Sequence, residues 1–261
     1  MTRLGRILNV LTGIGVLLVS AAVFAEPPEI FTNGLDMTFV RIRPALFTMG
    51  SPPSESGRRE NEARHRVMLT RPYYLQATEV TQGQWKSIMG DNPSRFKGCG
   101  DDCPVEQVSW NEVQAFIGKM NKKEEGIIYR LPTEAEWEFA ARGRGEPFLY
   151  AGGNDIEAVA WYSGNSKGRT HPVGLKAANG LGLYDMSGNV YEWCLDWYGN
   201  YPEGAVTDPP GPSSGGHRVL RGGSWYYDER SCRVAVRIIG IPFSRSDTLG
   251  FRLAGQERGL P

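Results

Sequence analysis

The chain has 261 residues, of which 40% are hydrophobic and 22% charged. This composition is that of a folded domain and excludes a disordered chain. Its 29 Lys and Arg balance 29 Asp and Glu, so no net positive charge is available to bind a nucleic-acid backbone. The 33 Gly, 17 Pro and 7 Trp predict frequent turns around large aromatic side chains and few long helices.

The first 25 residues are typical of a secretory signal peptide. Arg3 and Arg6 precede an uncharged run over residues 7–24, and the small residue Ala25 precedes a Pro-rich segment. We expect cleavage after Ala25, which leaves residues 26–261 as one mature domain in the periplasm. An uncleaved membrane anchor is the alternative, because the apolar run nearly reaches the roughly 18 residues that a spanning helix needs.

Three short helices are predicted from a repeated start signal, the capping box. In it, a Ser or Thr and a Gln or Glu three residues later bond each other's free backbone amides. The pairs are Thr81 with Gln84, Ser109 with Glu112, and Thr133 with Glu136. Apolar residues follow each box at helical spacing, and Gly90 and Gly143 stand where left-handed C-caps are expected. Glu134 and Glu136 would complement the dipole of the third helix, which is a structural role.

Strands are predicted at both ends of the mature chain, where apolar residues alternate with polar ones. The segments are 37–42, 65–69, 218–221, 232–238 and 250–253. Residues 143–216 are rich in Gly, Asn, Pro and aromatic residues and show little periodicity. A loop of that length is unusual in a compact domain, so we expect a bound ion and disulfides to order it.

The four cysteines suit an oxidising compartment, and their even number allows two disulfides. Cys99 and Cys103 are close enough to pair locally, which leaves Cys194 to pair with Cys232. Buried free thiols are one alternative. A zinc site is another, but none of the three His residues lies near a Cys in the sequence.

A possible calcium loop lies in the segment 182–193. Asp185 and Glu192 offer carboxylates, and the backbone carbonyls of Gly188 and Val190 can turn toward the same point. Calcium accepts six to eight oxygen ligands in irregular geometry, although this spacing is not that of an EF-hand. The alternative is a tight turn in which Asp and Asn side chains cap the backbone.

Several motifs occur in an order that resembles the formylglycine-generating enzyme family, also called sulfatase-modifying factors. They are Thr48-Met49-Gly50, Glu79-Val80-Thr81, Pro104-Val105, Ser109-Trp110, the segment 129–138, the segment 188–193, the segment 221–225 and Gly250-Phe251-Arg252. The resemblance covers nearly all of the mature chain. It implies an α+β fold, a single compact domain related to C-type lectins, with little regular secondary structure and structural calcium. The family's calcium ligands match Asp185, Gly188, Val190 and Glu192.

The chain departs from the family where the family's copper ion is bound. Family enzymes oxidise a substrate cysteine with copper held by two cysteines, and the first stands three residues after the Ser of the Gly-Gly-Ser motif. Tyr227 occupies that position here, and the alignment of the following residues places Cys232 on a non-catalytic position. Copper(I) requires soft thiolate ligands, so we expect no copper and no oxidase activity.

Two functions remain open at this point. The first is a non-catalytic regulator that binds a protein or peptide in the old substrate groove, formed here by Ser224, Trp225, Tyr226 and Tyr227. The chain resembles periplasmic members that regulate the threonine-phosphorylation pathway of type VI secretion through a membrane-spanning Ser/Thr kinase. The second is a periplasmic enzyme of altered chemistry, as in siderophore maturation.

Overall fold

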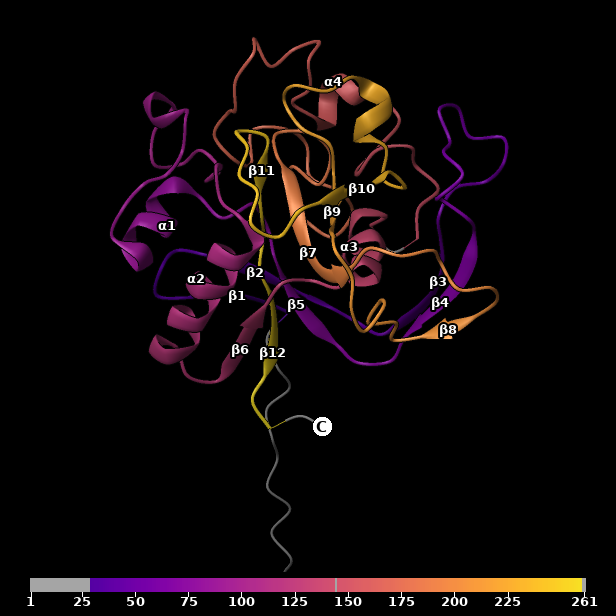
Figure 1. Cartoon of the computed structure of the whole chain (residues 1–261), viewed down its shortest axis with the longest axis horizontal. Coiled ribbons are helices and arrows are strands. Elements are labelled where there is room, and N and C mark those ends of the chain that lie inside the picture. The colour runs from indigo at the N-terminus through magenta and orange to yellow at the C-terminus, as the bar shows by residue number, and fades with distance from the viewer. Residues whose placement is uncertain (1–28, 144, 260–261) are drawn as a thin grey trace, which may run out of the picture.

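The computed structural model describes residues 29–143 and 145–259. The predicted signal peptide, residues 1–25, lies outside these residues. Within them, short helices surround three small sheets in one compact body (Figure 1). The expected α+β class and single compact domain are therefore confirmed. No helix among the described residues is both long and apolar enough to cross a membrane.

The largest sheet joins the two ends of the described chain. Its strands are antiparallel and lie in the order β1 (Ile30–Thr32), β2 (Thr38–Ile42), β5 (Tyr73–Gln76), β12 (Ala254–Glu257) and β6 (Ile127–Arg130). Because β12 inserts between β5 and β6, the C-terminal strand completes a sheet that the N-terminal strands begin (Figure 1).

Two smaller sheets complete the framework. One has the order β10 (Arg237–Gly240), β9 (Arg218–Arg221), β7 (Tyr191–Trp197) and β11 (Leu249–Gly250), with β11 parallel to β7. The other contains β3 (Ala45–Met49), β4 (His65–Leu69) and β8 (Val206–Thr207). The strand β7 begins within the predicted calcium-loop segment 182–193 and contains Glu192, so the end of this segment belongs to an inner strand of the sheet.

All three predicted helices begin at their predicted capping boxes. They are α1 (Gln82–Met89), α2 (Trp110–Lys123) and α3 (Glu134–Ala141), and both reciprocal bonds of each box are present. Gly90 and Gly143 have the predicted positive φ, at 90° and 57°. The shorter elements are α4 (Ile156–Val159), which the Asp155 side chain caps, and the 3₁₀ turns η1 (Lys97–Cys99) and η2 (Glu229–Cys232).

Two strand predictions are wrong in position. The segment 232–236 is not a strand, because the Asp228 side chain caps the 3₁₀ turn η2 through the Ser231 amide, and the strand β10 begins only at Arg237. The segment 251–253 is also outside the strands. Its carbonyls bond the amides of Val80 and Gln76 while the chain crosses from one sheet to another. Its apolar residues are thus buried between sheets, which explains the misleading pattern.

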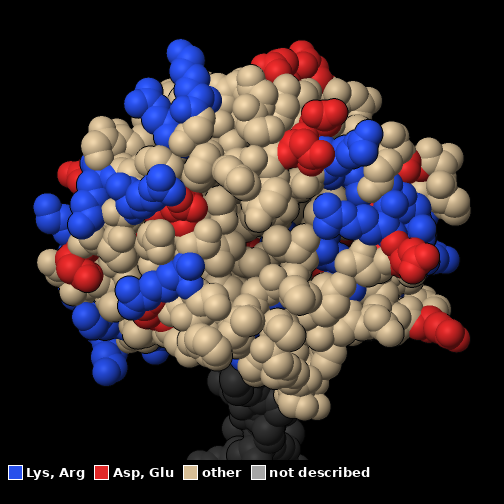
Figure 2. Space-filling model, turned by 45° about the horizontal axis from the view of Figure 1, so that its top comes forward, with Lys and Arg blue, Asp and Glu red and all other residues tan. Residues whose placement is uncertain are grey.

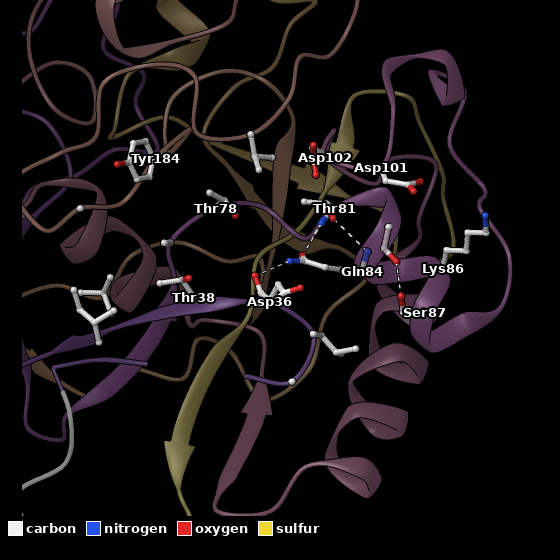
Figure 3. Close-up of a pocket in the computed structure, with 18 of the residues that line it drawn as sticks. Asp36, Thr38, Thr78, Thr81, Gln84, Lys86, Ser87, Asp101, Asp102 and Tyr184 are labelled. Atoms are coloured by element: carbon white, nitrogen blue, oxygen red, sulfur yellow. Dashed lines mark hydrogen bonds between the residues drawn. The ribbon is translucent and has the colours of Figure 1, made fainter. Parts of the chain in front are cut away.

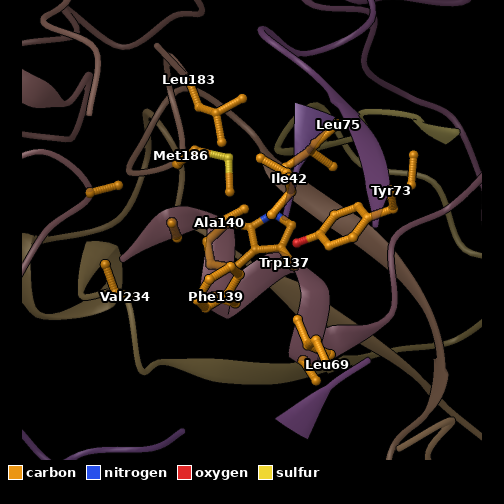
Figure 4. Close-up of a cluster of buried hydrophobic side chains, with 14 of the residues drawn as sticks. Ile42, Leu69, Tyr73, Leu75, Trp137, Phe139, Ala140, Leu183, Met186 and Val234 are labelled. Carbon is orange, nitrogen blue, oxygen red and sulfur yellow. The ribbon is translucent and has the colours of Figure 1, made fainter. Parts of the chain in front are cut away.

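Trp137 on α3 lies at the centre of one of the two large apolar clusters (Figure 4). Ile42, Leu75 and Met186 pack around it from separate elements. The second cluster joins α1 and α2 to the largest sheet through the predicted apolar face of α2, which comprises Val113, Phe116, Ile117 and Met120. These clusters make the irregular middle of the chain part of a packed core.

Candidate functional site

The predicted calcium loop is a tight backbone turn with three residues in the left-handed region. Asp185, Gly188 and Asn189 have φ of 55°, 85° and 56°. A Cβ at Gly188 would lie 2.3 Å from the carbonyl oxygen of Trp161, so only glycine fits there. The Gly188 amide donates to the Gly222 carbonyl at 2.8 Å, which connects the loop to the Gly-Gly-Ser motif.

Glu79 is a second anchor of this loop, which the sequence analysis did not identify as a site residue. Its carboxylate accepts hydrogen bonds from the Val190 amide at 3.0 Å and from the Asn189 side chain at 2.7 Å. The signal was present in the Glu79-Val80-Thr81 motif, but only Thr81 had a local interpretation there. The bond partners lie 110 or more positions away in the sequence.

Three buried carboxylates gather beside this turn, and one buried cation faces them. Glu79, Asp185 and Glu192 are all buried, as is Arg252. Arg252 donates to both Glu192 oxygens at 2.7 Å, and the Trp137 indole donates to Oε2 of Glu192 at 2.8 Å. Burial raises the pKa of Asp185 to about 6, and burial together with Asp185 and Glu192 raises the pKa of Glu79 well above its usual value. The cluster therefore has more acidic groups than Arg252 alone can balance.

The donor set fits an oxygen-seeking cation. Oδ1 of Asp185 is buried without a hydrogen-bond partner. In residues 29–143 and 145–259, the carbonyls of Gly188 and Val190 accept no hydrogen bond, and Oε1 of Glu192 accepts one. Within this described part of the chain, no group of three His, Cys, Asp or Glu side chains could hold a metal ion by itself. A calcium ion here would therefore need the two backbone carbonyls as well as Asp185 and Glu192.

The predicted groove is not formed as expected. Ser224 and Trp225 are buried, and the Trp225 indole donates to the Asp247 carbonyl at 2.8 Å. Tyr226 and Tyr227 are exposed, at 62% and 40%, with their rings in edge contact 5.4 Å apart. None of the principal cavities in the described part of the chain is lined by any of the four residues. The region is an exposed tyrosine pair on a buried tryptophan, not a groove.

One of the two predicted disulfides is present. Cys99 and Cys103 are bonded, with Cα atoms 5.9 Å apart. The prediction that Cys194 pairs with Cys232 is wrong, because both are free and fully buried. Cys194 points into the apolar cluster around Trp137, whereas Cys232 packs in a separate cluster. Sequence order could not reveal that different parts of the core separate the two sulfurs.

The residues at the expected copper position do not fit copper. Tyr227 offers no thiolate. Burial raises the pKa of the Cys232 thiol to about 12 and that of Cys194 well above its usual value. Neither free cysteine is a reactive thiolate at neutral pH, and they lie in different clusters.

A network of buried ion pairs supports the same region from α3. Glu138 accepts bonds from Arg221 and Arg142, and Glu134 accepts two from Arg237, at 2.6 and 2.7 Å. Glu134 and Glu138 on α3 therefore bind buried arginines. Near them, Asp196 accepts from the Glu134 amide, and burial and the Glu134 charge raise the pKa of Asp196 to about 8.

Comparison with known proteins agrees with the motifs and the fold. Residues 26–257 match the family described as "Sulfatase-modifying factor enzyme 1-like domain". The chain belongs to the sulfatase-modifying factor family. Relatives in this family include the formylglycine-generating enzyme of Streptomyces coelicolor, which is 38% identical over 65% of this chain and 60% of its own length. Another relative, named chaperone protein LppX, from Paenibacillus barcinonensis, is 35% identical over 59% of this chain and 69% of its own.

Other relatives of the sulfatase-modifying factor family connect it with different functions. A protein of Chlamydia caviae named serine/threonine-protein kinase pkn1 is 40% identical over 58% of this chain, which is 24% of the kinase's length. Among solved structures, Treponema denticola variable protein 1 has a TM-score of 0.78 at 34% identity and covers 87% of this chain and 99% of its own. PvdO from Pseudomonas aeruginosa has a TM-score of 0.76 at 28% identity, with coverages of 89% and 100%. Membership in the family therefore does not specify a single activity.

Proposed function

We propose that this protein is a non-catalytic member of its family that acts by binding another protein. The observation that carries the proposal is the loss of the thiolate pair. Tyr227 stands at the first copper position, and the two free thiols are buried in separate clusters. Without two accessible thiolates, the chain lacks the soft ligands that the family's copper chemistry requires.

Exposed apolar side chains favour a protein partner. Five of them, Tyr226, Tyr227, Ile239, Ile241 and Phe243, are more than one-third exposed and follow the Gly-Gly-Ser motif within one short stretch of chain. Figure 2 shows a face whose centre is largely free of charged side chains, with Lys, Arg, Asp and Glu mostly toward its margins. Apolar groups of this size are common anchors at protein interfaces.

The partner that we propose is the periplasmic part of a membrane-spanning Ser/Thr kinase, in a pathway that regulates type VI secretion. Two kinds of support exist. The first 25 residues have the layout of a signal peptide, and part of a relative named as a kinase matches this domain. A regulator of this kind would hold the kinase's periplasmic segment without modifying it.

We also propose that calcium stabilises the loop beside Glu79. Asp185, Glu192 and the carbonyls of Gly188 and Val190 would hold it, and the ion would supply positive charge to the cluster of three buried carboxylates beside Arg252. Glu79 fixes the loop backbone through Val190 and Asn189, so the ligands would be oriented before the ion binds.

The catalytic half of the proposal is tested with a cysteine peptide of the sulfatase type. The purified protein is incubated with copper and oxygen, and the peptide is analysed by mass for conversion of the thiol to the aldehyde. The Streptomyces enzyme serves as the positive control. No conversion above the copper-only blank is expected, and conversion above it would show that the protein is an enzyme.

The binding half is tested by titrating the purified periplasmic segment of the kinase against the mature protein. The double change Tyr226→Ala and Tyr227→Ala should weaken binding at least tenfold, because interface aromatics commonly contribute about 2 kcal/mol or more. Phe148→Ala is the matched control, since Phe148 is 37% exposed and lies outside this stretch. Equal affinity of all three proteins would show that the tyrosine pair is not the contact surface.

A further inference from the structure

A large open hollow lies on one face of the main sheet, and the tyrosine pair is not part of its lining. Its volume is about 1120 Å³. The floor comes from β2 and the chain after β5, with Thr38, Val40, Ala77 and Thr78. The helix α1 forms one wall and the segment 181–184 another (Figure 3). The volume exceeds the roughly 300–1,000 Å³ of small-molecule pockets, so the hollow has room for a short peptide segment.

The charged side chains of the hollow are mostly acidic and have no partner. Asp36, Asp101 and Asp102 line it, against the single cation Lys86. In the described part of the chain, none of these four side chains forms an ion pair or a hydrogen bond. Figure 3 shows Asp101 and Asp102 on one side of Thr81 and Asp36 on the other. A ligand lying across the hollow would therefore meet unpaired carboxylates on both sides.

The hollow also offers apolar surface and an aromatic ring. Ile30 on the edge strand β1 is 60% exposed, and Leu181 and Val173 lie on other parts of the lining. Tyr184 adds an aromatic ring, which can stack on a cationic side chain. One space thus offers both acidic and apolar groups, and a ligand of matching chemistry must carry both positive and apolar groups.

We propose that this hollow binds an extended peptide segment in which basic and apolar residues alternate. In an extended chain, successive side chains point to opposite sides, so such a segment can present lysines or arginines to Asp36, Asp101 and Asp102 and apolar residues to Ile30 and its neighbours. This site goes beyond the tyrosine pair proposed above. It would give the protein a second contact region with its own charge specificity.

The test uses a fluorescent hexapeptide of alternating leucine and lysine, measured by anisotropy. We expect saturable binding that weakens when ionic strength rises from about 0.05 to about 0.5 M, because salt screens exposed charges. The triple change Asp36→Asn, Asp101→Asn and Asp102→Asn should weaken binding about tenfold or more, since each exposed charge pair contributes about two- to fivefold. Glu203→Gln removes one exposed charge outside the lining and should have no effect.

Two isoleucine variants, one in the lining and one outside it, test the apolar half of the proposal. Ile30→Ser should weaken binding of the hexapeptide, whereas Ile128→Ser, an exposed isoleucine on the opposite edge strand β6, should not. Tyr226→Ala should also leave this affinity unchanged, so failure here is separable from failure of the kinase titration. The proposal is overturned if the hexapeptide does not bind, if its leucine–glutamate counterpart binds equally well, or if the triple variant matches Glu203→Gln.

Discussion

Replacement of Asp185 by Asn tests the proposed calcium site, because its effect on stability should differ in sign between the metal-free and the calcium-bound protein. Oδ2 of Asp185 accepts a bond from the Gly174 amide at 2.7 Å, and an asparagine oxygen can accept the same bond. The other oxygen, Oδ1, has no partner. Burial raises the pKa of Asp185 to about 6, so without metal the ionised form at pH 7 costs up to about 3 kcal/mol. The metal-free variant should therefore be at least as stable as the wild type.

Calcium should reverse this order. At a free concentration 100 times its Kd, a ligand that binds only the folded state adds about 2.7 kcal/mol. For a domain of this size, that corresponds to an increase in Tm of about 5–11 °C. The wild type should show this increase, and Asp185→Asn should show little of it because one charged ligand is missing.

The assay is thermal unfolding at pH 7 in chelator and in calcium, with magnesium as the control ion and Glu203→Gln as a control for charge removal. Magnesium should have a smaller effect, because it requires near-ideal octahedral geometry. The reasoning is refuted if chelator leaves the wild-type Tm unchanged. It is refuted equally if calcium raises the Tm of Asp185→Asn as much as that of the wild type.

Three further predictions concern the scaffold. Glu138→Gln should lower the free energy of unfolding in urea by about 3–5 kcal/mol, because it removes the negative charge that faces the buried Arg221 and the mostly buried Arg142. Glu136→Gln, in a partly exposed pair, should cost about 1 kcal/mol or less. Equal losses would contradict the difference in burial. The folded state keeps the Asp196 proton up to about pH 8, whereas the unfolded state loses it near pH 4. Stability should therefore fall as pH rises from about 4 to about 8. Asp196→Asn should remove about 1.4 kcal/mol per pH unit of this slope. An unchanged slope would show that Asp196 is not the group. Thiol titration should find Cys194 and Cys232 unreactive in the native protein, and both should react after denaturation without reductant. If neither reacts in the denatured protein, the two are joined by a disulfide.

Local sequence was enough to predict the structure wherever the bonded groups lie within a few residues of each other. The capping box of Thr133 and Glu136 is complete within four residues, and the helix begins where the sequence predicts. The same holds for Ser109 with Glu112. The Cys99–Cys103 disulfide belongs to this group, because three intervening residues keep the two sulfurs close in any fold.

The family motifs allowed prediction of the domain as a whole and of the position of the turn that we propose binds calcium. They could not show how the loop is fixed. Glu79 accepts bonds from Val190 and Asn189, which lie 110 or more positions later in the chain, and Arg252 binds Glu192 from the C-terminal segment. These contacts depend on which strands become neighbours, and a single sequence does not contain that information.

The sequence by itself determined the class of fold, the helix starts, the local disulfide and the presence of Tyr227 where the family resemblance leads us to expect a copper ligand. Each of these depends on residue identity and short spacing. Tertiary structure alone decided that Cys194 and Cys232 lie in separate clusters, that Trp225 is buried beneath Tyr226, and that Asp36 faces the same hollow as Asp101 and Asp102. The physical reason is that burial and proximity are set by the packing of distant segments, and the same residue types are compatible with either outcome until that packing forms.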